Sequence, residues 1–225
     1  MSVTSIGLAV SGPVQTKADL VFESLKARLI AGWRDYGEML NTVEIAEEFG
    51  VSRRPVMDAM ARLEGSGLIE IIAQVGCRVV LPDRETVRQH FYTAGVLDGA
   101  AARLAAGHAT ELQRRALADA LGQSARAAAA HDQHDFEEAN KAFHATLLAA
   151  GRNDRLTALA RQSWDLSDFY LQRRTPEDLS RSHAEHETIA EAVLGGDAEA
   201  ARAAAEAHLE RFGEVAILPE DGVQR

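Results

Sequence analysis

The chain has 225 residues, of which 46% are hydrophobic and only 5% aromatic, and it carries a formal net charge of −10. This length allows one large or two small domains with real cores, and the alanine-rich, aromatic-poor composition favours a mostly α-helical protein. The single cysteine excludes a disulfide within the chain, and no apolar run approaches the roughly 20 residues of a membrane span, so we expect a cytoplasmic protein without a membrane partner.

The negative charge is unevenly distributed along the chain. Residues 17–82 contain 8 lysines and arginines against 10 acidic residues, whereas residues 83–225 contain 16 against 24. The first part is therefore nearly neutral rather than basic. Any contact of this part with nucleic acid would have to depend on a local cluster of cations.

The first predicted elements follow a tail. Residues 1–16 have no firm periodicity and are predicted to form a flexible tail. Apolar residues at helical spacing predict a helix over 17–31, and residues 33–40 read as a connecting turn. Asn41 or Thr42 can cap a second helix, which Gly50 ends in a sharp turn.

The stretch from Val51 to Ile69 predicts the second helix of a helix-turn-helix. Ser52 is expected to cap this helix by accepting backbone N–H groups, and Pro55 falls in its first turn, where the missing N–H costs little. Arg53 and Arg54 stand at its N-terminus. Two guanidiniums at this place can contact base edges or phosphates, so the stretch predicts binding of double-stranded DNA.

Two short apolar runs follow the helix-turn-helix. Residues 68–72 and 77–81 are predicted to pair as a hairpin, which after a helix-turn-helix would be a wing. Pro82 ends this unit. We therefore predict a winged helix-turn-helix domain over residues 17–82.

The remainder of the chain predicts an antiparallel six-helix bundle over residues 83–215, followed by a short tail over 216–225. Glycines and prolines mark the helix ends, and Thr110, Asn153 and Asp197 are expected caps. The predicted helices span residues 84–106, 110–130, 133–150, 153–172, 177–194 and 197–213.

All eight histidines lie beyond residue 83, and three of them can meet in the bundle. Asn140 and His144 share one helix face. His186 precedes the Gly195-Gly196 turn by nine residues and His208 follows it by twelve, so their heights in an antiparallel hairpin differ by less than about one turn. Three imidazoles with an amide or carboxylate oxygen suit a divalent metal, zinc first, with nickel, manganese or iron as alternatives.

Other interpretations of the polar residues in the bundle stay open. A single histidine on a helix is more often an ordinary core or surface residue, which is our expectation for His90, His108, His131, His134 and His183. His134 and Asp135 form a weaker local alternative to the metal site. Asp98 faces inward on the first bundle helix and can reach a buried site, although it can equally be a surface charge.

The order of these motifs resembles the GntR family of regulators, in the FadR-type branch with a C-terminal FCD domain and in its smaller, six-helix VanR-like version. The resemblance covers about residues 17–214. The residues that carry it are Gly50-Val51-Ser52-Arg53-Arg54-Pro55-Val56, Ala59-Met60-Ala61-Arg62-Leu63-Glu64-Gly65-Ser66-Gly67-Leu68-Ile69, Asn140 with Phe143-His144, Glu185-His186, Gly196-Asp197 and His208.

The resemblance implies a homodimeric transcription factor that binds an inverted-repeat operator and responds to a small carboxylate. It implies a metal held by Asn140, His144, His186 and His208. Asp98, from its place on the inner face of the first bundle helix, is our candidate effector contact. The DNA-reading positions that it implies are Ser52, Arg53, Arg54, Pro55, Gln74, Gly76 and Arg78.

The chain departs from the family pattern at several positions. Val43 and Met57 stand where many relatives have arginine, which should weaken phosphate binding. Asn140 stands where a carboxylate is common, and a neutral amide is a poorer ligand for a hard cation. The stretch from His90 to Asp98 has no arginine for an effector carboxylate.

Three functions are therefore compared. The expected one is a ligand-responsive regulator, most simply a repressor of metabolic genes, that is not an enzyme. The second is a metal-binding or interaction module whose DNA-binding domain is weakened. The third is a hydrolase that uses a histidine-bound metal to activate water, against which stands the lack of a recognisable general base beside the three histidines.

Overall fold

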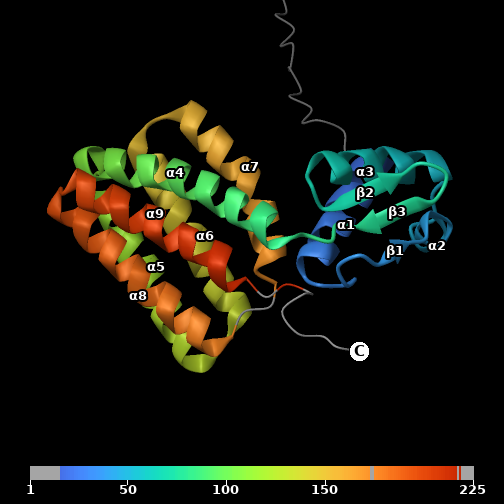
Figure 1. The fold of residues 1–225 in the computed structure, drawn as a ribbon. Coiled ribbons are helices and arrows are strands. Elements are labelled where there is room, and N and C mark those ends of the chain that lie inside the picture. Colours follow the sequence, from blue (N-terminus) through green and yellow to red (C-terminus); the bar gives the residue numbers. More distant parts are fainter. Residues whose placement is uncertain (1–15, 173–174, 217, 219–225) are drawn as a thin grey trace, which may run out of the picture. The chain divides into compact units, whose positions relative to one another are not determined.

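The computed structural model describes residues 16–172, 175–216 and 218, so most of both predicted tails lies outside the described residues. The described part forms two compact units that divide near Val80 (Figure 1). Helices dominate both units, which confirms the predicted fold class. No described helix is long and apolar enough to cross a membrane.

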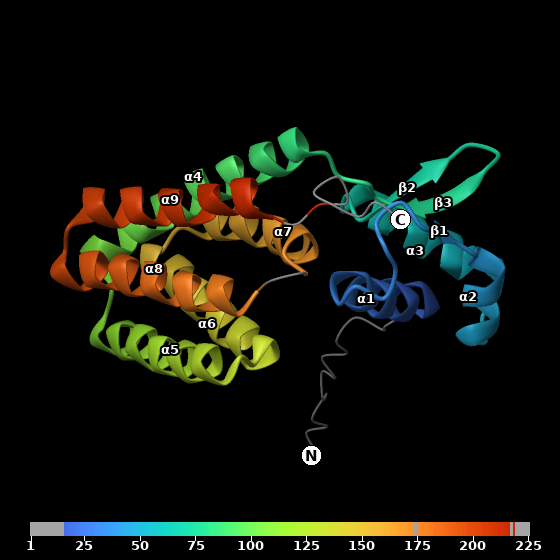
Figure 2. The same cartoon turned by 60° about the horizontal axis from the view of Figure 1, so that its bottom comes forward.

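The first unit combines three helices with a small antiparallel sheet. Its elements are α1 (Lys17–Ile30), β1 (Met39–Leu40), α2 (Thr42–Glu48), α3 (Arg53–Gly65), β2 (Ile69–Ile72) and β3 (Gly76–Val79). The strand order is β1-β3-β2, and the β2–β3 hairpin pairs Ile71 with Cys77 (Figure 2). The helix-turn-helix and its wing are therefore present as predicted.

Two local expectations in this unit were wrong. Residues 33–40, read as a turn, end in the strand β1, whose Met39 pairs with Arg78 of β3. A strand of two residues has no alternation from which it could be predicted. Ser52 occupies the N-cap position of α3, but its side chain makes no capping hydrogen bond. Asn41, in contrast, caps α2 by accepting from the backbone N–H groups of Val43 and Glu44.

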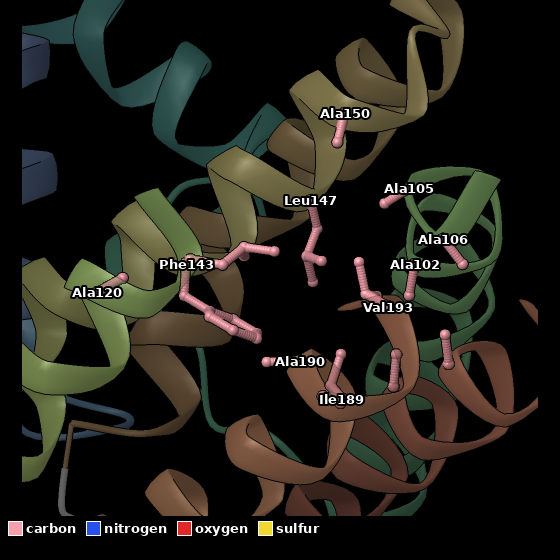
Figure 3. Packing of buried hydrophobic residues seen from close by; sticks show 13 residues of the cluster. Ala102, Ala105, Ala106, Ala120, Phe143, Leu147, Ala150, Ile189, Ala190 and Val193 are labelled. Carbon is pink, nitrogen blue, oxygen red and sulfur yellow. The ribbon is translucent and has the colours of Figure 1, made fainter. Parts of the chain in front are cut away.

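The second unit is a bundle whose six described helices have bounds within a few residues of the prediction. They are α4 (Arg84–His108), α5 (Glu111–Ala130), α6 (Gln133–Gly151), α7 (Asp154–Tyr170), α8 (Pro176–Gly195) and α9 (Ala198–Val215). The side chains of Thr110, Asn153 and Asp197 cap α5, α7 and α9, as expected from the sequence. Phe143, Leu147 and the alanines around them fill the core between the helices (Figure 3).

The central helix of the bundle is α4, which packs against α6, α7, α8 and α9. Its contact with α9 is especially close because two glycines face that helix. A Cβ atom at Gly95 would lie 3.2 Å from the carbonyl oxygen of Glu206, and one at Gly99 would lie 3.1 Å from that of Arg202. The backbones of α4 and α9 can approach this closely only where no side chain separates them.

Candidate nucleic-acid interface and candidate metal centre

The N-terminus of α3 presents the two arginines that the sequence singled out. Arg53 and Arg54 are exposed, and neither makes an ion pair with another described residue. The first turn of α3 contains no acidic residue, so the positive end of the helix dipole adds to both guanidiniums. This end of α3 therefore combines free backbone donors with positive charge, as a phosphate or base edge requires.

Most other cations of the first unit are paired with acids. The pairs are Lys26–Glu23, Arg28–Glu48, Arg34–Glu38, Arg62–Asp19 and Arg78–Glu70. Acidic residues of the unit thus neutralise most of its cations, whereas Arg53 and Arg54 at the start of α3 remain available. Arg78 is a predicted DNA contact, but its Nη2 lies 2.7 Å from Oε2 of Glu70 across the hairpin.

The remaining predicted DNA-reading residues lie where a DNA backbone could reach them. Ser52 and Gln74 are exposed, while Pro55 and Gly76 are half-buried. Gln74 and Gly76 have positive φ values of 63° and 142° in the tight turn of the wing. Val43 and Met57 expose 38% and 42% of their surface, so the positions that lack arginine face solvent.

Three histidines converge inside the bundle from α6, α8 and α9. His144, His186 and His208 each offer a ring nitrogen, and these atoms all lie within 4.8 Å of one another. All three residues are buried, with exposed fractions of 7%, 0% and 2%. The Nε2 atoms of His186 and His208 are 3.1 Å apart, so the two rings lie side by side as the helical spacing predicts.

The geometry of this cluster fits a metal such as zinc. A tetrahedral zinc ion with Zn–N distances of roughly 2.0–2.1 Å separates two nitrogen ligands by about 3.3 Å. The 3.1 Å between His186 and His208 is close to this value. Phe143 stacks on His186 with ring centroids 4.6 Å apart and covers one face of that ring. His144 completes a set of three nitrogen donors, which leaves coordination positions for oxygen ligands.

A carboxylate lies beside the cluster, contributed by the residue that we had assigned to the effector. Asp98 on α4 is 7% exposed, and its Oδ2 is 2.6 Å from Nδ1 of His144. Asn140, the predicted oxygen ligand, lies one helical turn before His144 and is half-buried. The structure therefore brings both oxygen donors to the site.

Two of the three histidines, His144 and His208, line a cavity of about 50 Å³. Its lining includes Phe91, Asp98, Asn140, Lys141, Ser163, Trp164, Ser167 and Asp168. Among the described residues that line the cavity, Lys141 is the one lysine or arginine, and its Nζ is 3.5 Å from Oδ2 of Asp168. The cavity therefore has a cation from α6, whereas the stretch of α4 from His90 to Asp98 contains none.

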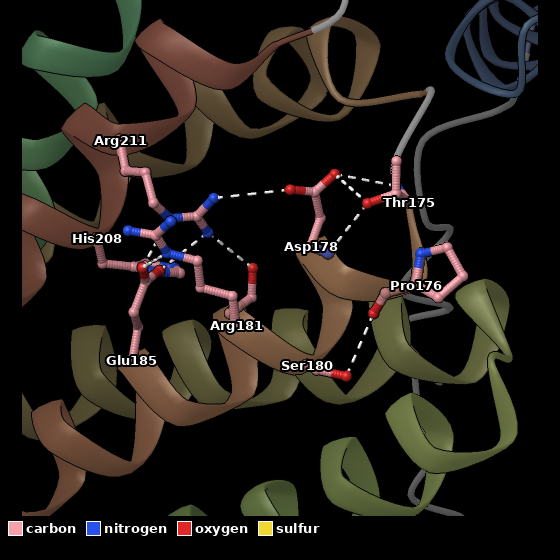
Figure 4. A network of polar contacts seen from close by, with 9 residues as sticks. Thr175, Pro176, Asp178, Ser180, Arg181, Glu185, His208 and Arg211 are labelled. Carbon is pink, nitrogen blue, oxygen red and sulfur yellow. Dashed lines mark hydrogen bonds and ion pairs between the residues drawn. The ribbon is translucent and has the colours of Figure 1, made fainter.

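Two further residues near the histidines were not recognised from the sequence. The Oε2 atom of Glu185 is 2.7 Å from Nδ1 of His208, and Arg211 contacts the same carboxylate (Figure 4). Glu185 does point away from its neighbour His186, as its place on the helix requires, but it reaches a histidine on α9. A carboxylate is thus present beside the histidines. It contacts Nδ1 of His208, whereas Nε2 of that ring faces His186.

The other histidines have ordinary environments. His183 contacts Ser124 through Nδ1 at 2.9 Å. His90 contacts Ser167 through Nε2 at 2.8 Å, and burial lowers the pKa of His90 to about 4, so it is neutral at pH 7. His108, His131 and His134 are exposed. His134 and Asp135 do not belong to the described metal-competent cluster.

Both units of the chain are similar to known protein families. Residues 17–79 match the model of "Bacterial regulatory proteins, gntR family", and residues 93–211 match that of the FCD domain. The transcriptional regulator LutR of Bacillus subtilis is 30% identical over 80% of this chain and 91% of its own length. The transcriptional repressor RspR of Escherichia coli is 28% identical over 90% of both chains.

A solved structure shares the fold as well. The crystal structure of a putative GntR transcriptional regulator from Rhodococcus sp. RHA1 covers 88% of this chain and 96% of its own, with a TM-score of 0.73 and 22% identity. The relatives and both matching families are transcriptional regulators and not enzymes, as we expected. The chain therefore belongs to the GntR family of bacterial transcriptional regulators, in the branch with an FCD domain.

Proposed function

We propose that this regulator is a homodimeric, metal-containing repressor that binds an inverted-repeat operator in the cytoplasm and responds to a small carboxylate. The observation that carries the proposal is the buried three-histidine cluster, whose ligand atoms lie within 4.8 Å of one another in a chain that also holds a winged helix-turn-helix. Burying polar imidazole rings costs free energy unless their nitrogens bind a partner, and a metal ion would be such a partner. The naming of RspR as a repressor supports the same direction of control.

The cavity next to the histidines is the proposed effector site. Its volume of about 50 Å³ suits a compact acid rather than a large metabolite. In our proposal, one carboxylate oxygen of the acid completes the coordination of the metal, while Lys141 provides a counter-charge in place of the missing arginine. An acid bound to Lys141 would compete with Asp168, and this competition links occupancy of the cavity to the contact between α6 and α7.

The effector changes DNA binding only if it prefers one conformation of the dimer over another. The direct test is fluorescence anisotropy with the gene's own upstream region at low salt, with and without Zn²⁺ and a panel of small hydroxy- and oxo-acids. We expect binding to the DNA, and at least one acid that weakens it. Lys141→Gln should bind DNA like the wild type without acid but respond less to that acid. Lack of any DNA binding would contradict the proposal.

The oxygen ligand can be assigned by comparing two variants. We propose that Asp98, rather than Asn140, supplies the main oxygen ligand, because it carries charge, is buried and lies 2.6 Å from His144. Asp98→Ala should weaken Zn²⁺ binding by at least about 10-fold, and Asn140→Ala by less, since a charged carboxylate attracts a divalent cation more strongly than a neutral amide oxygen does. Isothermal titration calorimetry measures both. A greater loss for Asn140→Ala would assign the ligand to the amide instead.

A further inference from the structure

One buried network adjoins the histidine cluster and shares only His208 with it and with the lining of the effector cavity. It joins Glu185 on α8 to His208 and Arg211 on α9 (Figure 4). The side chain of His208 is only 1% exposed and that of Arg211 only 9%, while the carboxylate of Glu185 is 24% exposed. The network therefore lies under the surface, with its carboxylate reaching toward solvent.

The carboxylate of Glu185 is held on more than one side. The Nε atom of Arg211 lies 2.6 Å from Oε1 of Glu185, and Nη2 of Arg211 donates to Oε2 at 2.9 Å. Arg181, one turn earlier on α8, also donates to Oε1 at 3.2 Å. Arg211 is itself placed by Ser182, whose Oγ is 3.1 Å from Nη2. These contacts leave little freedom to the Glu185 carboxylate.

This arrangement decides which nitrogen of His208 carries the proton. A carboxylate paired with guanidinium groups can only accept a hydrogen bond, so Nδ1 of His208, at 2.7 Å from Oε2, must donate. The neutral ring then has its lone pair on Nε2. That atom is the one that faces Nε2 of His186 at 3.1 Å. Glu185 thus directs the only lone pair of His208 into the histidine cluster.

We propose that Glu185, held by Arg211, is a positioning residue that fixes His208 in the tautomer and ring orientation required for binding a metal through Nε2. The inference rests on the proposed metal-dependent function. Outer residues of this kind, which accept the second N–H of a metal-bound histidine, typically contribute 10–100-fold to metal affinity. His208 would therefore be a ligand whose orientation is set before the metal binds.

The chain offers a matched control on the same helix. Glu187 lies two residues after Glu185 and also stands near a histidine, at 3.6 Å from Nε2 of His183. His183 is outside the cluster. Glu187→Ala therefore removes the same charge from the same helix beside a histidine, without touching the network around His208.

The first measurement needs no metal. Long-range ¹H–¹⁵N spectra of the metal-free full-length protein report the tautomer of each ¹⁵N-labelled histidine. We expect His208 to carry its proton on Nδ1 in the wild type, in Glu187→Ala and in Glu185→Gln, because the amide oxygen of glutamine can still accept. Glu185→Ala should show a mixture of tautomers. An unchanged Nδ1–H tautomer in Glu185→Ala would overturn the inference even if the protein binds metal.

The second measurement is Zn²⁺ affinity by competition with a chelator. We expect a 10–100-fold weaker dissociation constant for Glu185→Ala, a smaller loss for Glu185→Gln and a change below about threefold for Glu187→Ala. Equal affinities of Glu185→Ala and the wild type would overturn the positioning role. A wild type that binds no Zn²⁺ would refute the proposed metal site, while the spectra would still decide whether Glu185 sets the tautomer. If Glu185→Ala does not fold, the Zn²⁺ affinities of Glu185→Gln and Arg211→Lys are measured instead. Both variants hold the ring of His208 less firmly, so we expect both to bind Zn²⁺ more weakly than the wild type.

Discussion

Replacing Arg53 or Arg54 by alanine should weaken operator binding by about 1–3 kcal/mol per half-site, or roughly 5- to 150-fold. Both side chains are exposed at the positive end of α3 and make no ion pair within the described part of the chain. Other cations of the unit are already neutralised by acids, so few groups can compensate for the loss. Fluorescence anisotropy at two or more salt concentrations measures the effect.

The salt dependence separates the two possible roles of each arginine. An arginine that contacts phosphate should lower the slope of log K against log salt by about 1 when removed, whereas one that reads a base should relax specificity at one position. Lys26→Ala is the control, because Lys26 lies in the same unit but is paired with Glu23 at 3.1 Å. Losses below about 1 kcal/mol for both Arg53→Ala and Arg54→Ala would show that α3 is not the main reading element.

Such a result would favour the alternative of an interaction module with a weakened DNA-binding domain. Val43 and Met57 would then be the most informative residues, since they expose apolar surface at positions where many relatives have arginine. Two exposed apolar side chains alone do not decide between the two functions. The measured affinity for DNA does.

Replacing His186 by alanine should abolish stabilisation by metal. A ligand that binds only the folded state stabilises it by about 2.7 kcal/mol at 100 times its dissociation constant. The wild type should therefore gain several degrees in melting temperature with excess Zn²⁺, and His186→Ala should gain almost nothing. His186 is fully buried, so the variant will also lose some stability from the cavity that it creates.

The comparison must accordingly be made within each variant, with and without metal, so that the cost of the cavity cancels. His183→Ala is a suitable control, because His183 lies on the same helix and is bonded to Ser124 but does not belong to the cluster. It should lose some stability yet keep the full shift on adding Zn²⁺. If His186→Ala keeps the shift too, the metal binds elsewhere and the three histidines are only a polar core.

Local sequence signals were sufficient to predict most of the fold. Capping residues such as Asn41, Thr110 and Asn153 are local signals, because their side chains bond to backbone groups within a few residues. The convergence of His186 and His208 could also be predicted, since both positions are counted from one turn between adjacent helices. Such predictions need only the rise of a helix and the place where it ends.

The contacts that could not be predicted are those between helices with no fixed register in the sequence. Asp98 meets His144 because α4 packs against α6, and Lys141 meets Asp168 because α6 contacts α7. Glu185 meets His208 because α8 packs against α9. Distances of this type depend on how whole helices are rotated and shifted against each other, which periodicity does not specify.

The close packing of α4 on α9 has a consequence for judging related sequences. Gly99 is the immediate neighbour of Asp98, and the backbone that it touches belongs to the helix that carries His208. A side chain at Gly99 would force the two helices apart, and the donors on them would separate by the same amount. A homologue that keeps all three histidines but replaces this glycine should therefore not be assumed to bind metal. Whether a homologue retains the metal site therefore depends also on this glycine, which is not itself a metal ligand.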